Sequence, residues 1–333
     1  MTLKDVIKRP LLDLRISVTD RCNMRCRYCM PREHFDKDHV YLPKSDILSF
    51  EEIVRVVESL LSTGLRKVRL TGGEPLIRKD LHKLIEQLRE LSPDLDIALT
   101  TNAQLLSKSI ENLKQAGLSR ITVSLDAIDA GVYQAMGDTK STPNAIIESI
   151  DRTLSLGIPV KVNTVIQKGI NEHQVIPLVK EMGSRNVPIR FIEYMDVGAT
   201  NSWNLEHVLT GKEMRHIIEN EFGPIQPIVP IHPSDVARTY HTNSGYVIGF
   251  IESISNPFCG DCSRARLSAN GSIFTCLFAT EGYDLRGILR MDASKDDITN
   301  AISAIWSQRK DRYSETRSEK TNLKRIEMSF IGG

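Results

Sequence analysis

The sequence of 333 residues is poor in aromatic side chains and carries almost no net charge. Phe, Trp and Tyr make up 6% of it, and 43 basic residues nearly cancel 42 acidic ones. Proteins that bind nucleic acid combine a basic surface with aromatic stacking groups, so this composition argues against a nucleic-acid partner. An anionic ligand must instead be held by local charge.

The sequence also lacks long apolar runs. No segment reaches the roughly 18 apolar residues that a membrane-spanning helix needs. Residues 1–10 contain Lys4, Asp5, Lys8 and Arg9 and no apolar stretch, so they do not have the pattern of a secretory signal. We therefore expect a cytoplasmic protein without a membrane partner.

Cysteine is scarce, but the six cysteines fall into two groups of three. A reducing cytosol disfavours disulfides, and a chain with 41% hydrophobic residues can bury a core without crosslinks. Cysteines that were only small core residues would not be grouped in this way, so the spacing favours metal sites. The two groups are Cys22, Cys26 and Cys29 near the start and Cys259, Cys262 and Cys276 near the end.

The first 195 residues alternate short β-rich segments with longer helical ones. Ser49 and Glu52 predict a capping box, after which apolar residues recur at helical spacing as far as Gly64. Six β-then-α units predict parallel strands with right-handed crossovers, in an open doubly wound sheet or in part of a barrel. The expected strands are 12–18, 66–71, 95–101, 119–125, 158–166 and 187–194.

Polar and apolar residues alternate in three of these strands. Lys67 and Arg69 share one face of the second strand, Lys161 lies on one face of the fifth, and Arg190 lies on one face of the sixth. Strands covered by helices on both faces should be continuously apolar, so the alternation favours a barrel wall around a polar, ligand-filled lumen. An exposed edge strand is the alternative, and it explains one such strand better than three.

The pattern changes near residue 200, where we place a boundary between segments 1–200 and 201–333. Four prolines lie between residues 224 and 233, and the β-then-α alternation stops. The second segment is expected to be an α+β extension of the barrel. Its expected elements are helices at 211–221 and 296–308 and strands at 245–252, 264–269 and 272–277.

The first cysteine trio reads C-x3-C-x2-C directly after the first expected strand, with Tyr28 between its last two cysteines. A structural zinc site or a fully ligated iron–sulfur cluster needs four protein ligands, so three thiolates leave one metal position open. His34 or His39 could complete a zinc site, which is the alternative. The tight loop instead resembles the radical S-adenosylmethionine (SAM) superfamily at every fixed position.

This resemblance implies an incomplete (β/α)6 TIM-like barrel in which the three cysteines hold a [4Fe-4S] cluster. The open iron binds SAM, and an external one-electron donor triggers its cleavage to a 5'-deoxyadenosyl radical. The sequence GGEP at residues 72–75, after the second strand, resembles the superfamily's GGEP motif. The residues implied in SAM binding are Tyr28, Gly72, Gly73, Glu74, Ser124 and Met195.

The second trio reads C-x2-C-x13-C and again offers only three thiolates. With His241 as a fourth ligand it would form a zinc ribbon. Residues 258–267 and 270–277 are instead similar to the C-terminal signature of the molybdenum-cofactor biosynthesis protein A family, the GTP 3',8-cyclases. The chain departs from the family's sequence pattern at two positions: it has Ser263 where the family commonly has Asn, and Ala103 where the family commonly has Gly.

Similarity to that family implies conversion of GTP to (8S)-3',8-cyclo-7,8-dihydroguanosine 5'-triphosphate, the first step of molybdenum cofactor biosynthesis. The 5'-deoxyadenosyl radical abstracts the ribose C3' hydrogen, and the C3' radical attacks guanine C8. A second [4Fe-4S] cluster on the second trio binds the guanine base. Guanidinium groups suit phosphate oxygens, and the chain has no G-x4-G-K-[ST] loop that could replace them. The residues implied in GTP binding are Arg15, Lys67, Arg69, Thr100, Lys161, Arg190, Arg264 and Arg266.

The same family implies that the C-terminal Gly332 and Gly333 enter the active site, because only glycine is slim enough for a narrow channel. A frayed tail is the alternative. No acid–base pair is required, and the product passes to cyclic pyranopterin monophosphate synthase. The sequence leaves the oligomeric state, including a homodimer, open. A two-cluster enzyme that modifies peptides is the second hypothesis, although such enzymes usually have more than three C-terminal cysteines.

Overall fold

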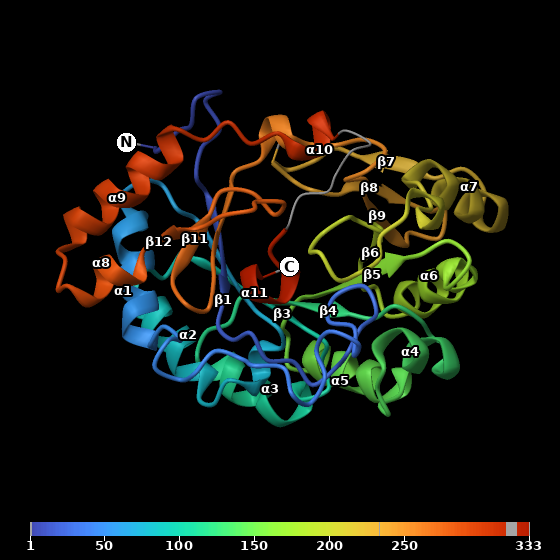
Figure 1. Cartoon of the computed structure of the whole chain (residues 1–333). Coiled ribbons are helices and arrows are strands. Elements are labelled where there is room, and N and C mark those ends of the chain that lie inside the picture. The colour runs from blue at the N-terminus through green and yellow to red at the C-terminus, as the bar shows by residue number, and fades with distance from the viewer. Residues whose placement is uncertain (1, 233, 318–324, 333) are drawn as a thin grey trace.

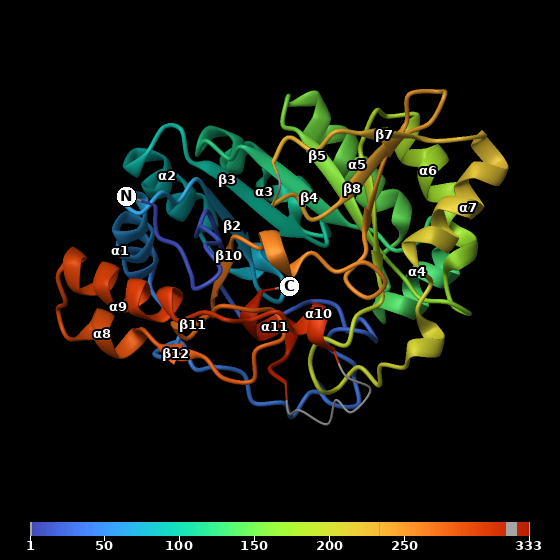
Figure 2. The same cartoon turned by 90° about the horizontal axis from the view of Figure 1, so that it is seen from above.

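The computed structural model describes residues 2–232, 234–317 and 325–332. Its centre is one twelve-stranded sheet in the order β12-β11-β10-β1-β2-β3-β4-β5-β6-β9-β8-β7. The eight strands from β10 to β9 in this order are parallel. The sheet curves around a hollow, and the helices that follow β1 to β6 cover its outer face (Figure 1; Figure 2).

The first half alternates strands and helices, which confirms the six predicted parallel βα units. The strands are β1 (Asp13–Ser17), β2 (Lys67–Thr71), β3 (Asp96–Thr101), β4 (Arg120–Ser124), β5 (Val160–Ile166) and β6 (Ile189–Glu193). The helices are α1 (Phe50–Leu61), α2 (Leu81–Leu91), α3 (Leu106–Gln115), α4 (Ala130–Gly137), α5 (Pro143–Ser155) and α6 (Val175–Gly183). None of the helices in the described part of the chain is long and apolar enough to cross a membrane.

The second half of the chain, from α7 onward, extends the same sheet at both edges. Its strands are β7 (Gln226–Ile228), β8 (Arg238–His241), β9 (Val247–Ile251), β10 (Arg264–Leu267), β11 (Ser272–Phe274) and β12 (Tyr283–Asp284). Its helices are α7 (Gly211–Phe222), α8 (Arg286–Arg290), α9 (Lys295–Ser307), α10 (Tyr313–Thr316) and α11 (Met328–Ile331). Strand β10 pairs with β1 and strand β9 pairs with β6, both in parallel. The predicted α7, α9, β9, β10 and β11 are confirmed, whereas the short β7, β8, β12, α8, α10 and α11 were not predicted.

Local sequence explains where the longer helices begin. The Ser49 hydroxyl accepts a hydrogen bond from the Glu52 amide at 3.1 Å, and the Ser49 amide donates to the Glu52 carboxylate at 2.7 Å. This reciprocal pair is the predicted capping box, and it satisfies two backbone donors at the start of α1. The same arrangement starts α7 at Thr210 and α9 at Ser294.

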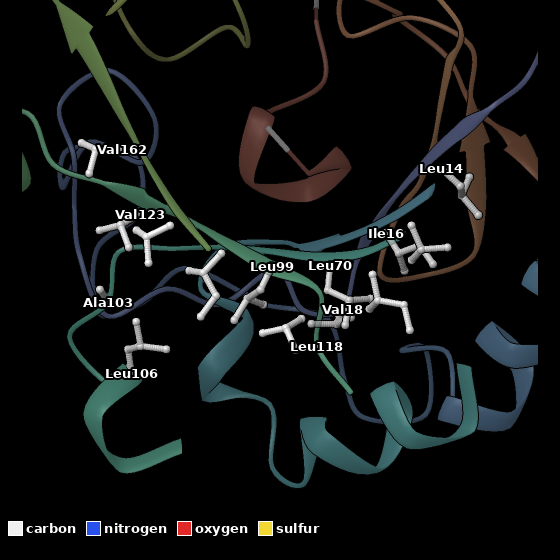
Figure 3. Close-up of a cluster of buried hydrophobic side chains, with 14 of the residues drawn as sticks. Leu14, Ile16, Val18, Leu70, Leu99, Ala103, Leu106, Leu118, Val123 and Val162 are labelled. Atoms are coloured by element: carbon white, nitrogen blue, oxygen red, sulfur yellow. The ribbon is translucent and has the colours of Figure 1, made fainter. Parts of the chain in front are cut away.

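The hydrophobic core lies between the sheet and the outer helices. In Figure 3 the labelled side chains, such as Leu70, Leu99 and Leu106, lie on the helix side of the sheet, and α11 lies on the opposite side. These three side chains are fully buried. Because neighbouring residues of a strand face opposite sides, the polar residues between them face the hollow, as the alternating pattern predicted.

A buried carboxylate joins the two halves at one end of the hollow. Glu193, the last residue of β6, is fully buried and accepts hydrogen bonds from the amides of Gly211, Ile254 and Ser255 at 2.8–2.9 Å. The Ser255 hydroxyl donates to it as well. One side chain therefore fixes both the start of α7 and the loop after β9.

Replacing Glu193 with Gln should lower the free energy of unfolding by about 2 kcal/mol, because hydrogen bonds to a charged group contribute about 1.5–3 kcal/mol. An anaerobic urea titration measures the change. Glu219→Gln, an exposed carboxylate on α7, is the matched control and should change stability by less than about 0.5 kcal/mol. Equal stability of the two variants would contradict the role of Glu193.

Candidate active site

One large cavity occupies the hollow of the sheet, and all six cysteines contribute to its lining. The cavity is bounded by the first cysteine loop, by the ends of strands β2 to β6 and by segments of the second half. Twelve other predicted site residues also line it: Arg15, Tyr28, Arg69, Gly72, Gly73, Glu74, Thr100, Ser124, Arg190, Met195, Arg264 and Arg266. The two cysteine trios, far apart in sequence, thus open into the same space.

Two glycines after β2 allow the chain to pack directly on the first cysteine loop. The Gly73 amide donates to the Thr19 carbonyl at 2.8 Å. A Cβ atom at Gly72 would lie 2.4 Å from the Thr19 carbonyl oxygen, and one at Gly73 would lie 2.2 Å from the Arg21 carbonyl oxygen. Larger residues are therefore excluded at both positions by the backbone of the loop, a reason that the sequence motif alone does not reveal.

Glu74 connects this turn to the end of β3. Its carboxylate accepts from the Thr101 hydroxyl at 2.7 Å and from the Asn102 amide at 2.8 Å. Burial raises the pKa of Glu74 to about 7, although these hydrogen bonds partly offset the increase. The Asn102 side chain in turn donates to Asn23 in the cysteine loop at 2.8 Å. Ala103, one of the two departures from the family pattern, has a φ of 61°, which explains why glycine suits this position.

Tyr28, the aromatic residue of the cysteine loop, is held by a carboxylate at the end of β4. Its hydroxyl donates to Asp126 at 2.6 Å, and the Val165 amide donates to the other oxygen of Asp126 at 2.9 Å. Burial raises the pKa of Asp126 to about 6. The loop is therefore fixed to β4 and β5 as well as to the GGEP turn.

The second trio lies against two arginines, of which Arg309 is buried and Arg264 is half-buried. Cys259 and Cys262 precede β10, and Cys276 follows β11. The Cys262 sulfur accepts from Arg309 at 3.2 Å and from Arg264 at 3.4 Å. Burial on its own raises the pKa of the Cys262 thiol, but these two arginines outweigh it and lower the pKa to about 6. Arg309 itself was not predicted, because an isolated arginine after a helix gives no signal in the sequence.

The donor set fits iron–sulfur clusters with an open position. Burial raises the pKa of Cys22 and Cys276 to about 11 and raises those of Cys26 and Cys29 as well, so a cationic centre is needed to keep these groups as thiolates. His34, His39 and His241, the alternative zinc ligands, do not line the cavity. Within residues 2–232, 234–317 and 325–332, no group of three His, Cys, Asp or Glu surrounds a point where a single ion could sit.

Arginines form a row across the floor of the cavity. Arg15 stands opposite Arg266 on one neighbouring strand and opposite Arg69 on the other. Burial is the largest cause, and repulsion between like charges the next, of the lowered pKa values of two of these arginines. The pKa of Arg15 falls to about 9, and that of Arg266 falls well below its usual range. Burial likewise lowers the pKa of Arg69 and of Arg190 to about 10. Such a row is suited to a polyanion, which would relieve the repulsion.

Two predicted cations lie outside the cavity lining. Lys67 forms an ion pair with Asp13 at 3.0 Å and is already neutralised. Lys161 is half-buried, and burial and nearby Arg190 lower its pKa. It therefore adds to the positive charge near Arg190 but does not line the cavity.

The C-terminal tail lies on the side of the sheet opposite the core (Figure 1; Figure 3). Met328 and Ser329 line the cavity, and the Gly332 carbonyl accepts a hydrogen bond from Arg266. Gly332 has a φ of 74°, and a Cβ atom there would lie 2.5 Å from the Thr71 side chain. Only glycine fits this position without strain. Gly333 lies outside the described residues.

Comparison with known proteins identifies two family regions. The profile of the Radical SAM superfamily matches residues 16–182, and that of Molybdenum Cofactor Synthesis C matches residues 187–315. Among solved structures, Streptococcus suis SuiB aligns with a TM-score of 0.61 at 17% identity, covering 94% of this chain and 70% of SuiB. The SuiB structure bound to S-adenosylmethionine aligns with a TM-score of 0.59 at 16% identity, covering 89% and 69%. At these identities the likeness supports the fold, a radical SAM partial barrel with an extension.

Sequence relatives match over nearly the whole length. The GTP 3',8-cyclase of Staphylococcus epidermidis is 46% identical in an alignment of 337 positions, gaps included, that covers 99% of both chains. The GTP 3',8-cyclases of Staphylococcus haemolyticus and Staphylococcus aureus are 46% and 44% identical with the same coverage. The chain therefore belongs to the radical SAM superfamily and, within it, to the family of GTP 3',8-cyclases.

Proposed function

We propose that the protein converts GTP to (8S)-3',8-cyclo-7,8-dihydroguanosine 5'-triphosphate in the first step of molybdenum cofactor biosynthesis. One observation carries this proposal: two separate cysteine trios line a single cavity that is also lined by a row of arginines on three adjacent strands. Two [4Fe-4S] clusters and SAM are the cofactors. Each trio leaves one iron of its cluster free for a ligand other than protein.

Cys22, Cys26 and Cys29 hold the first cluster, and hydrogen bonds join the loop around them to the neighbouring strand ends. Glu74 and Asp126 fix this loop to strands β3 and β4 through the hydrogen bonds described above. The GGEP turn exposes its backbone to the same part of the cavity, where Ser124 and Met195 complete the SAM site. Preorganisation of this kind positions a bound sulfonium without further rearrangement.

Cys259, Cys262 and Cys276 would hold the second cluster, which would supply an open metal position for the guanine base. Arg15, Arg69, Arg190, Arg264 and Arg266 bind the triphosphate, with Thr100 beside Arg69 at 3.4 Å. Arg264 and Arg266 lie on β10, between Cys262 and Cys276, so one continuous segment binds both the base and the phosphates.

When bound, the first cluster and SAM would supply a 5'-deoxyadenosyl radical that removes the C3' hydrogen of GTP. C3' then bonds to guanine C8, and the cyclised radical takes up one electron from the external donor and one proton from solvent. The protein contributes positioning and the exclusion of water. Gly332 and its neighbours in the tail close the cavity beside Arg266, which limits side reactions of a substrate radical.

Further parts of the proposal concern partners and organisation. The protein works in the cytoplasm, takes electrons from an external one-electron donor and passes its product to cyclic pyranopterin monophosphate synthase. Its two parts are residues 1–200 and 201–333, and a homodimer is the assembly we propose to test first, by light scattering.

The experiment that tests the function is an anaerobic assay with dithionite, SAM and GTP deuterated at C3'. We expect a product in which one hydrogen from solvent has replaced the deuterium of the substrate. The deuterium should be found in 5'-deoxyadenosine. A peptide-modifying enzyme would leave GTP unchanged. SAM cleavage without transfer of deuterium would overturn the proposal.

Arg69→Ala should weaken GTP binding about 10- to 100-fold, because a buried charge-assisted hydrogen bond contributes about 1.5–3 kcal/mol. Anaerobic calorimetry of the SAM-loaded enzyme measures the affinity. Arg152→Ala removes an exposed arginine that pairs with Glu111 on the outer helices, and it should leave the affinity unchanged. An equal effect of both substitutions would contradict a phosphate site at Arg69.

Reconstituted protein should contain about eight irons and eight sulfides, because each [4Fe-4S] cluster carries four of each. Cys26→Ala and Cys276→Ala should each reduce both values to about four, since the trios are independent. Anaerobic iron and sulfide analysis measures this. Bound zinc without sulfide would show that the trios are zinc sites.

A further inference from the structure

A single buried carboxylate holds the C-terminal tail, residues 325–332, against the rim of the cavity. We propose that this carboxylate, Asp196, is a positioning residue for the reaction, because it sets the place at which Gly332 meets Arg266. The inference rests on the proposed function, in which the tail completes the active site. Nothing in the sequence pointed to this residue.

Asp196 follows β6 and is only 3% exposed. Its Oδ2 accepts from the Tyr313 hydroxyl at 2.7 Å and lies 2.8 Å from Arg325 Nη1. Its Oδ1 lies 2.9 Å from Arg317 Nη2. Arg325 also donates to the Asp196 backbone carbonyl. Three side chains from the C-terminal segment thus converge on one acidic residue of the barrel.

The charges at this point do not balance without Asp196. The Arg325 side chain is buried and that of Arg317 is 13% exposed, and Asp196 is the carboxylate that both of them contact. Aromatic faces support the remaining charge: Arg325 lies 4.8 Å from the ring centre of Tyr313, which stacks on Phe278 at 4.6 Å. Removing the carboxylate would leave two guanidinium groups close together without a counter-charge. The tail would then leave its position, because the Arg325 guanidinium group is better solvated in water.

The segment after Asp196 contacts the tail a second time. The Glu327 carboxylate accepts from the Ala199 amide at 3.0 Å and from the Thr200 hydroxyl at 3.1 Å. The chain then makes one short helical turn, buries Ile331 fully and reaches Gly332. Because Arg325 and Glu327 both bind the 196–200 segment, that segment determines where the tip of the tail lies.

The alternative is that the contacts of the tip alone, burial of Ile331 and the hydrogen bond between Gly332 and Arg266, keep the tail in place. Asp196 would then only stabilise the fold. The two interpretations differ in what happens to the tail when the anchor is removed. If Asp196 is the anchor, its removal releases the tail while the barrel stays intact. If the contacts of the tip are sufficient, the tail stays in place.

The test is hydrogen–deuterium exchange of the reconstituted enzyme, read on peptides that cover residues 326–332. Asp196→Asn and Arg325→Gln should each increase exchange of these peptides about tenfold or more, with peptides from the barrel unchanged. Arg325→Gln keeps the Asp196–Arg317 pair, so it decides the question if Asp196→Asn folds poorly. Asp151→Asn, which removes an exposed carboxylate paired with Arg185, is the matched control and should change nothing in the tail.

Activity gives an independent readout. Both variants should lose kcat for GTP cyclisation while SAM affinity and iron content stay those of the parent protein. Unchanged exchange of the tail in both variants would overturn the proposal, whatever their activity. Faster exchange with full cyclisation would overturn the positioning role, whereas absence of GTP cyclisation in the parent protein would count against the proposed function and not against the anchor.

Discussion

Buried positive charge on the concave face of a parallel sheet is the constraint on which the rest of the structure depends. Arg266, Arg15 and Arg69 stand next to one another on three adjacent strands. Desolvation and mutual repulsion make this arrangement unfavourable in an empty protein, and they lower the pKa of Arg15. The negative charges of Asp13 and Cys262 offset part of the repulsion at Arg15. The remaining charge is suited to a bound polyphosphate.

The same constraint explains why the two halves of the chain are inseparable. Strand β10, from the second half, pairs in parallel with β1 and thereby completes the row of arginines. The strand also brings the second cysteine trio to the cavity that the first trio lines. Neither half alone contains the complete cavity. The buried joints at Glu193 and Asp196 fasten the halves together at the opposite edge of the hollow.

Much of this was predictable from sequence because it follows from local periodicity. Alternation in β2, β5 and β6 placed their polar side chains on one face, and the spacing of the cysteines separated two trios. Alternation could not tell that Lys67 pairs with Asp13 and lies outside the cavity lining. Short-range patterns give the face of a strand, but they do not give the partners on that face.

The contacts that sequence reasoning missed are all long-range. Arg309 reaches Cys262 across 47 positions, and Arg325 reaches Asp196 across 129. No spacing rule connects such residues, and the short α10 and α11 have too few residues to show a period. The need for Gly72 and Gly73 was recognised through a motif, but its physical cause, the cysteine loop packed against them, required coordinates.

The central claim is that two clusters, each with only three protein ligands, open into one cavity with GTP on the arginine row. An anaerobic crystal structure of the reconstituted protein with SAM and GTP tests it most directly. We predict three cysteine ligands at each cluster, SAM on one open iron, the guanine base on the other, and the triphosphate on Arg15, Arg69 and Arg266. A fourth side chain on either cluster, or a triphosphate bound away from this row, would contradict it.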